Sequence, residues 1–449
     1  MTATAFCLHA LGSSSEEFAT LRARLAGTLD LTGIDLPGFG RSSAATGTTV
    51  EEMAVQVERV IGQSGATEWV LIGHSMGGKV ASVVASRTID GSNGLFGLRA
   101  VVLLAASPLS PEPMAEDRRQ SMLGWAADGP IGPQDAETFI EANVASVLPP
   151  ESHEMAVHDV QRADPGAWRA WLLRGSREDW STTFGPNPVP ALVLAGADDG
   201  DLGPEAQQTL NLPHWPNGTF DVVPDAAHML PWEQPDAVAD RIRAFWDHRV
   251  DRGPVVPSSM ARVIASPRVS ARTRGILAER ALPDDPDAAP EVLTPVQLTT
   301  LRAIGRVVVP QPDDRPVDIA LRVDAQLAAG LGDGWRPDGL PADADAYRAG
   351  LDALEADAAR GDDHLRAVLD DVTAGDHTPT AGPFDAGQLT AWAEDACVDL
   401  VKQWAAHPAT MADIDYDGFA NGGDGIRKQG FTLLGAGERE AWEPTGGTR

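Results

Sequence analysis

The feature that most constrains the fold is a serine flanked by glycines where an apolar run meets a helix-like stretch. Val70–Ile72 leads into Gly73-His74-Ser75-Met76-Gly77, and the helical pattern begins near Lys79. A serine on so sharp a turn has a strained backbone, so the residues two positions away have to be small. The turn raises the hydroxyl above the sheet and aims the first amides of the helix at developing negative charge. The pattern therefore predicts that Ser75 is a nucleophile at the end of a parallel strand.

The first 250 residues alternate short apolar runs with helix-like stretches, which predicts an α/β fold with a parallel sheet and helices on both sides. The runs are rich in Val, Ile and Leu, which is typical of strands covered on both faces. The predicted strands are 5–8, 29–34, 69–72, 101–104, 191–194 and 219–223. The predicted helices are 16–26, 50–62, 79–89, 204–210 and 237–248. Residues 107–188 interrupt the alternation and predict a helical insertion.

A serine hydroxyl needs a base, and in this arrangement the partners follow in the order serine, acid, histidine. The predicted strand at 191–194 runs into a turn that carries Asp198, Asp199 and Asp201, and His228 follows the last predicted strand. Loops at the carboxyl ends of parallel strands converge at one edge of the sheet. We therefore predict His228 as the general base and an aspartate near position 199 as its partner. Asp199 is favoured and Asp198 is the next candidate.

Two backbone amides are needed to stabilise an oxyanion. One is expected from Met76, the residue after the nucleophile. The other is expected from the loop after the first strand, at Leu11. His9 and His74 are interpreted as structural, hydrogen-bonding histidines that line the turn.

Five stretches in residues 1–249 together resemble the α/β-hydrolase superfamily in its esterase- and lactonase-like branch. They are HALGSS (9–14), DLPGFGRS (35–42), GHSMGGKVA (73–81), LVLAGADD (192–199) and DAAHMLPWEQPDAV (225–238). The resemblance implies an α/β-hydrolase fold with a mostly parallel sheet and a Ser75–Asp199–His228 triad. One departure is His9-Ala10 where the family has His-Gly, so Ala10 needs a negative φ.

The same resemblance makes residues 107–188 a lid and implies a serine hydrolase that forms an acyl-enzyme from a small-molecule substrate. The bond cleaved is expected to be a carboxylic ester, a lactone or a related acyl bond, and the alternative is a C–C hydrolase or lyase with the same triad. We expect no cofactor and no metal. The insertion carries aromatic and aliphatic residues that favour a moderately apolar substrate, although core packing explains them equally well: Trp125, Phe139, Val144, Trp168 and Trp171.

The composition changes after about residue 249. Residues 250–292 are rich in Pro, Asp and Arg and are predicted to form a linker. Residues 293–449 are predicted to form a mainly α-helical second domain, whose first helix has Thr294 as its cap and Pro295 as its first residue. Further helices are predicted at 317–331, 344–360, 363–372 and 389–406.

Three stretches of the second half resemble the small subunit (subunit 3) of gluconate 2-dehydrogenase-like enzymes. They are LTPVQLTTLRAIGRVVVPQ (293–311), AYRAGLDALEADA (346–358) and HPATMADIDYDGFANGGDGIRKQGFTLLG (407–435). Members of that family accompany a flavin-dependent oxidoreductase, usually of the glucose–methanol–choline type. The resemblance therefore implies a docking module, and an accessory subunit for such a flavoprotein is the alternative function.

Charge and cysteine content limit the remaining classes of function. The net charge of −30 disfavours nucleic acid and anionic lipid as partners. The two cysteines, Cys7 and Cys397, indicate a reducing compartment, and we see neither a secretory signal nor an apolar stretch near the roughly 18 residues of a membrane span. A cytoplasmic protein is expected. The acidic turn at 413–424 resembles a calcium loop but has Asp424 where glutamate is usual, so an ordinary polar loop is expected.

Overall fold

The computed structural model describes residues 2–44, 47–312, 315–332, 337–419, 422–424, 435 and 438. The chain divides into two compact units. The first unit comprises Met1–Asp251, Pro257–Pro283 and Asp417–Arg449. The second unit comprises Arg252–Val256 and Asp284–Tyr416.

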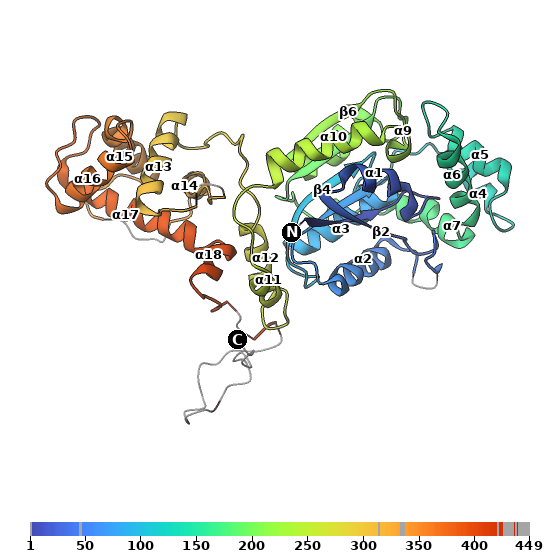
Figure 1. Ribbon diagram of the computed structural model, residues 1–449, viewed down its shortest axis with the longest axis horizontal. Coiled ribbons are helices and arrows are strands. Elements are labelled where there is room, and N and C mark those ends of the chain that lie inside the picture. The colour runs from blue at the N-terminus through green and yellow to red at the C-terminus, as the bar shows by residue number, and fades with distance from the viewer. Residues whose placement is uncertain are drawn as a thin grey trace. The chain divides into compact units, whose positions relative to one another are not determined.

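A six-stranded, fully parallel sheet forms the centre of the first unit (Figure 1). The strands lie in the order β2-β1-β3-β4-β5-β6. Their bounds are β1 Ala3–Leu8, β2 Leu29–Ile34, β3 Trp69–His74, β4 Leu98–Leu104, β5 Ala191–Gly196 and β6 Gly218–Val223. All six strands overlap the predicted ones, and the predicted α/β-hydrolase fold with its helical second part is confirmed.

Alternate residues of the strands face two separate apolar cores. Phe6 of β1 belongs to the core under α2 (Val50–Ser64) and α3 (Met76–Ile89). Its neighbour Cys7 belongs to the opposite core, under α1 (Ala19–Leu25) and α10 (Pro235–Phe245). Both edge strands depart from the expected burial on both faces: alternate residues of β2 are exposed to solvent, and Val223 is the one buried residue of β6.

The predicted insertion between β4 and β5 is helical. It contains α4 (Glu116–Trp125), α5 (Pro133–Glu141), α6 (Pro150–Arg162), α7 (Pro165–Leu173) and the 3₁₀ helix η3 (Gly175–Arg177). The other short elements are η1 (Ser15–Phe18), α8 (Pro204–Ala206), η4 (Gln207–Asn211), η5 (Leu212–His214), α9 (Leu230–Glu233) and η6 (Trp246–Val250).

The segment predicted as a linker contains two helices, α11 (Ser258–Ile264) and α12 (Ala271–Arg280). Helix α12 packs closely on the end of α3, since a Cβ on Gly275 would lie 2.8 Å from the carbonyl oxygen of Ile89. The guanidinium of Arg274 is buried and donates to the carbonyl oxygens of Gly91 and Ile264. These contacts place most of the segment within the first unit.

Helices build the second unit around a separate apolar core. They are α13 (Pro295–Val308), α14 (Ile319–Ala328), α15 (Asp343–Ala358), α16 (Asp362–Ala374), α17 (Ala386–Ala405) and α18 (Pro408–Asp413). Thr294 caps α13 and Pro295 is its first residue, as predicted. Gly350 of α15 allows a close approach to α17, because a Cβ there would lie 2.2 Å from the Trp392 ring. Much of the predicted stretch 407–435, including Asn421 of the acidic turn, lies outside the described residues.

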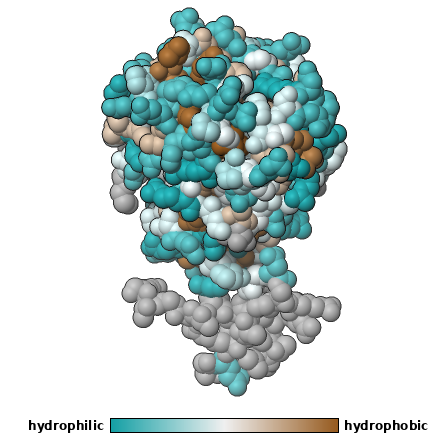
Figure 2. All heavy atoms as spheres, turned by 90° about the vertical axis from the view of Figure 1, so that its right-hand side faces the viewer, coloured by the Kyte–Doolittle hydropathy of each residue, from teal (hydrophilic) through white to brown (hydrophobic). Residues whose placement is uncertain are grey.

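Hydrophilic residues cover most of the face of the molecule that Figure 2 shows, and apolar residues are scattered over it. Such scattered apolar residues are ordinary for a protein surface. Within the described ranges, none of the helices combines the length and the apolar character that crossing a bilayer requires.

Candidate active site

Ser75 stands on the strained turn that the sequence predicts. Its backbone has φ 50° and ψ −118°, a conformation that costs a non-glycine residue about 1–3 kcal/mol. Both flanking glycines are needed by space. A Cβ on Gly77 would lie 2.1 Å from the carbonyl oxygen of Leu8, and one on Gly73 would lie 2.7 Å from the carbonyl oxygen of Gly77. Close packing of the surrounding backbone therefore holds Ser75 in this strained conformation, with its hydroxyl above the sheet.

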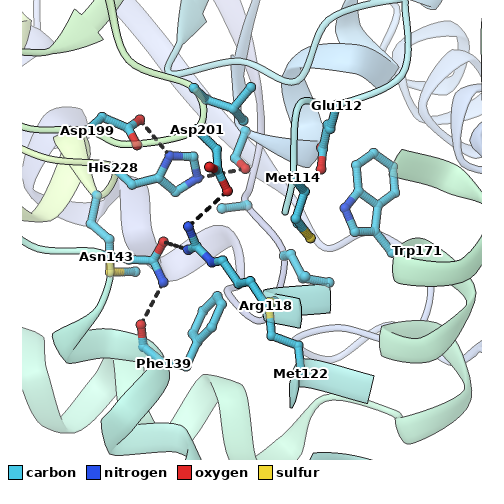
Figure 3. Close-up of a pocket in the computed structure, with 15 residues that line it drawn as sticks. Glu112, Met114, Arg118, Met122, Phe139, Asn143, Trp171, Asp199, Asp201 and His228 are labelled. Carbon is cyan, nitrogen blue, oxygen red and sulfur yellow. Dashed lines mark hydrogen bonds and ion pairs between the residues drawn. The ribbon is translucent and has the colours of Figure 1, made fainter. Parts of the chain in front are cut away.

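The structure brings Ser75, His228 and Asp199 into one chain of hydrogen bonds (Figure 3). Nε2 of His228 lies 2.8 Å from Oγ of Ser75, and Nδ1 lies 2.9 Å from Oδ2 of Asp199. Among the three competing aspartates, Asp199 contacts the imidazole, whereas Asp201 forms an ion pair with Arg118 at 3.1 Å. The side chains of His228 and Asp199 are 15% and 7% exposed, so their mutual attraction is weakly screened.

The opposite charges of His228 and Asp199 raise the pKa of the imidazole and lower the pKa of the carboxyl group. Burial lowers the pKa of His228, but the carboxylate and hydrogen bond of Asp199 outweigh it, and the pKa is raised above its usual value. Burial raises the pKa of Asp199, but the His228 charge and hydrogen bond prevail and the pKa is lowered. A carboxylate with a lowered pKa is ionised at neutral pH, so Asp199 is placed to stabilise a positive charge on the His228 ring.

The loop that carries His228 is held by two groups that the sequence patterns did not indicate. The carbonyl oxygen of Asn143 accepts hydrogen bonds from the amides of His228 (3.1 Å) and Met229 (3.2 Å). The carboxylate of Glu233 accepts from the amides of Ala227 (3.0 Å) and Met229 (3.0 Å). A carboxylate that binds several amides fixes the backbone around it.

The loop after β1 carries the predicted oxyanion residue. Leu11 lines the same cavity as Ser75, and Met76 opens helix α3, whose first amides have no partner within the helix. Ala10 is not among the described non-glycine residues with positive φ, so its methyl group is tolerated. The positive φ falls instead on Gly12, at 72°.

His9 has a structural place in that loop. Its Nε2 accepts a hydrogen bond from the amide of Leu36 (2.9 Å), and its Nδ1 lies 2.8 Å from the carbonyl oxygen of Ala10. Because Nε2 accepts, the proton of a neutral ring is on Nδ1. Burial lowers the pKa of His9, which favours this neutral form.

A cavity lies over Ser75, with about 50 Å³ open to water-sized molecules. Arg118 of α4 crosses it and donates to Asp201 and, at 2.9 Å, to the side chain of Asn143 (Figure 3). The carboxyl of Glu112 also faces the cavity, and burial raises its pKa. The lining residues are Ala10, Leu11, Ser75, Glu112, Met114, Arg118, Met122, Phe139, Asn143, Trp171, Asp199, Asp201, Leu202, His228 and Met229.

The aromatic residues of the insertion divide between cavity and core. Phe139 and Trp171 line the cavity. Trp168 is fully buried and packs edge-on against Phe139, with ring centroids 5.1 Å apart, and Trp125 also packs edge-on against Phe139, at 6.4 Å. The insertion thus contributes an apolar wall that Trp168 and Trp125 support.

Lys79 of α3 ties the insertion to the nucleophile helix. Its ammonium is buried and donates to the carbonyl oxygens of Gly175 (3.2 Å), Ser176 (3.5 Å) and Glu178 (3.0 Å). Burial lowers its pKa to about 8. In the part of the chain that the structure describes, no group of three or more His, Cys, Asp or Glu side chains is arranged to hold a metal ion.

The sequence profile of the alpha/beta hydrolase family matches residues 5–241, and the chain belongs to this family. It is 26% identical over 249 residues to a 2-succinyl-6-hydroxy-2,4-cyclohexadiene-1-carboxylate synthase of Serratia proteamaculans. The alignment covers 53% of this chain and 91% of that protein. It is also 26% identical over 253 residues to a pimeloyl-[acyl-carrier protein] methyl ester esterase of Pectobacterium carotovorum, with 53% and 92% covered. An esterase structure from Exiguobacterium antarcticum aligns with a TM-score of 0.49 at 18% identity and covers 55% of this chain and 92% of that one. The chain is thus an esterase-like hydrolase.

Proposed function

We propose that the protein is a serine hydrolase that cleaves a carboxylic ester, a lactone or a related acyl bond through an acyl-enzyme. The observation that carries the proposal is the hydrogen-bonded chain from Ser75 through His228 to Asp199, which opens onto a cavity. Family membership and an esterase among the relatives support it.

In the first half of the reaction, Oγ of Ser75 attacks the carbonyl carbon while Nε2 of His228 takes the hydroxyl proton. The amides of Met76 and Leu11 are proposed to stabilise the resulting oxyanion. When the bond to the leaving group breaks, His228 returns the proton to the leaving oxygen. In the second half, His228 takes a proton from water, which attacks the carbonyl carbon of the acyl-enzyme. His228 then returns the proton to Oγ of Ser75, and the acid is released.

Substrate class follows from the cavity and from the names of the relatives. Phe139, Trp171 and Met114 favour a moderately apolar acyl or leaving group. One matched relative is named as an esterase and the other as a synthase, so a C–C hydrolase or lyase with the same triad is the alternative. Product analysis with a β-diketone and a simple ester as competing substrates separates the two.

Replacement of Ser75 by alanine tests the proposal. We expect S75A to lose labelling by a fluorophosphonate probe and to lose activity by about 10⁶-fold, because the nucleophile is gone while the fold remains. The matched control is S82A. Ser82 is a buried serine of α3 whose hydroxyl donates to the carbonyl oxygen of Gly78, and S82A should be labelled like the wild type. Equal labelling of S75A and wild type would refute the assignment.

We further propose that the chain consists of a hydrolase domain at 1–249 with a lid at 107–188, a linker at 250–292 and a helical domain at 293–449. We propose that the helical domain docks a flavin-dependent oxidoreductase, in keeping with its resemblance to gluconate 2-dehydrogenase subunit 3. Co-purification of the full chain with a yellow flavoprotein would support docking, and a colourless chain that is fully active alone would argue against it. The free thiols of Cys7 and Cys397 support a cytoplasmic location.

A further inference from the structure

A second carboxylate–imidazole pair lies beside the proposed triad, and the mechanism above uses neither member. Oε1 of Glu17 is 3.1 Å from Nδ1 of His74, and both side chains are completely buried. Nε2 of His74 is 2.8 Å from the backbone carbonyl oxygen of His228. The rings of His74 and His228 are 5.4 Å apart.

The hydrogen-bond partners fix one of the two protons of this pair. A carbonyl oxygen only accepts, so Nε2 of His74 carries a hydrogen and donates it to His228. One proton then remains between Nδ1 of His74 and the carboxyl of Glu17, on either partner. In both arrangements the pair is neutral overall and the donor faces His228, so the contact with the His228 backbone is maintained.

The pair joins segments that are far apart in sequence. Glu17 lies on η1, His74 ends strand β3, and His228 follows β6. The other carboxyl oxygen of Glu17 is 3.5 Å from the amide of Ala10, in the loop that carries the proposed oxyanion donor. A buried carboxylate thus contacts the oxyanion loop directly and the histidine loop through one imidazole.

His228 is consequently held at three points. Its side chain bonds to Asp199, its amide donates to the carbonyl oxygen of Asn143, and its carbonyl oxygen accepts from His74. The amide and carbonyl contacts determine where the backbone lies, and the backbone determines how far Nε2 is from Oγ of Ser75. A displacement of about 1 Å at such a site costs roughly 10²-fold in rate.

We propose that Glu17 and His74 form a positioning pair that sets the His228 backbone for proton transfer from Ser75. This inference rests on the proposed function, since it assigns the pair to the same triad. Neither residue lines the cavity, so their loss should lower kcat and leave KM nearly unchanged.

Four variants test the pair in the full chain, assayed with a p-nitrophenyl ester. We expect H74A to lower kcat by roughly 10²-fold and E17A by roughly 10-fold, each with KM within about 3-fold of wild type. H74Q can still present an amide N–H to the His228 carbonyl, and E17Q can still donate to Nδ1 and accept from Ala10. Both conservative variants should therefore recover most of the lost kcat, which a general loss of packing would not predict.

Glu58 provides the matched control. It is a partly buried carboxylate of the same unit, on α2, and pairs with Arg87 at 3.7 Å and with the side chain of Asn93 at 3.2 Å. E58A should lower the melting temperature and leave kcat unchanged. The low-field proton resonance of Nδ1–H in His228 gives a second readout, and it should shift or broaden in H74A and remain in H74Q.

The outcomes separate this inference from the proposed function. If the wild type shows no hydrolysis that depends on Ser75, the proposed function fails and the pair has nothing to position. If the wild type is active and S75A is not, but H74A and E17A retain the wild-type kcat, the pair is not a positioning device. The positioning role would also be overturned if H74Q and E17Q lost as much kcat as H74A and E17A, and if E58A lost the same amount at an equal drop in melting temperature. Such a result would indicate a general loss of packing.

Discussion

The two units of the chain differ in where they hold strained backbone. Within the described residues, four non-glycine residues have positive φ: Ser75, Ala105, Asp225 and Asp415. The first three lie in the sheet unit, directly after or close behind the ends of β3, β4 and β6. The fourth lies in the helical unit, after its last helix. Strain in the sheet unit therefore gathers at the strand ends where the site is, which is typical of positions kept for function.

Buried charges differ in the same way. In the sheet unit, Glu17, His74 and Lys79 are completely buried and contact segments distant in sequence. In the helical unit, the buried carboxylate of Asp324 accepts from three successive amides, at residues 291–293, just before the first helix. Such a contact stabilises a chain turn but brings no reactive groups together. The comparison assigns the chemistry to the sheet unit and local stabilisation to the helical unit.

The largest effect that would sharpen this comparison is expected at Asp199. D199N keeps the shape of the side chain but removes its charge, and kcat should fall by about 10⁴-fold because the imidazolium loses its partner. Activity requires neutral His228, whose pKa Asp199 raises, so activity is lost as pH falls through that pKa. In D199N the acid limb of the pH–rate profile should move to lower pH.

D198N is the matched control and should keep the wild-type rate and pH–rate profile. A D198N rate as low as that of D199N would contradict the choice of Asp199 as the triad acid.

The next largest effect is expected in the helical unit. Leu351 of α15 is fully buried in its core, so L351A should lower the free energy of unfolding of that unit by about 2–5 kcal/mol. The exposed Val398 gives the control V398A, which should change it by no more than about 0.5 kcal/mol. Ester hydrolysis should be unaffected. Denaturant titration with activity and fluorescence measured on the same samples checks this, and loss of activity together with the L351A transition would show that the units are coupled.

Local patterns in the sequence were enough for most of the fold. Apolar runs located all six strands, and the capping residues Thr294 and Pro295 located the start of α13. The features that the sequence did not indicate depend on tertiary contacts. The edge strands β2 and β6 are only partly buried, since the helices do not fully cover the sheet at its two edges. Pro and Asp content indicated a linker at 250–292 but not the helices α11 and α12 within it, because the close packing of Gly275 on α3 is a contact between distant segments.

Within the site, sequence reasoning found the residues that have a local signature and missed those that act across distant segments. Ser75 has its glycine pattern, and Asp199 and His228 follow predicted strands. Glu17 and Asn143 have no such pattern, because a carboxylate on η1 or a carbonyl after α5 becomes part of the site only when β3 and the loop after β6 are brought beside it. The glutamates at positions 16 and 17 gave no sign of which one is buried.

The smallest expected effect compares one capping box in each unit. Thr49 is the N-cap of α2 and Thr294 is the N-cap of α13, and each side chain accepts a hydrogen bond from the amide three residues later. Removal of such a cap costs about 1 kcal/mol. T49A should lower the unfolding free energy of the sheet unit alone, and T294A that of the helical unit alone, since neither cap reaches beyond its own unit. T49S and T294S keep the hydroxyl and should restore the loss. A shift of the activity-monitored transition in T294A would mean that the helical unit supports the sheet unit, and the separation of chemistry from stabilisation drawn above would not hold.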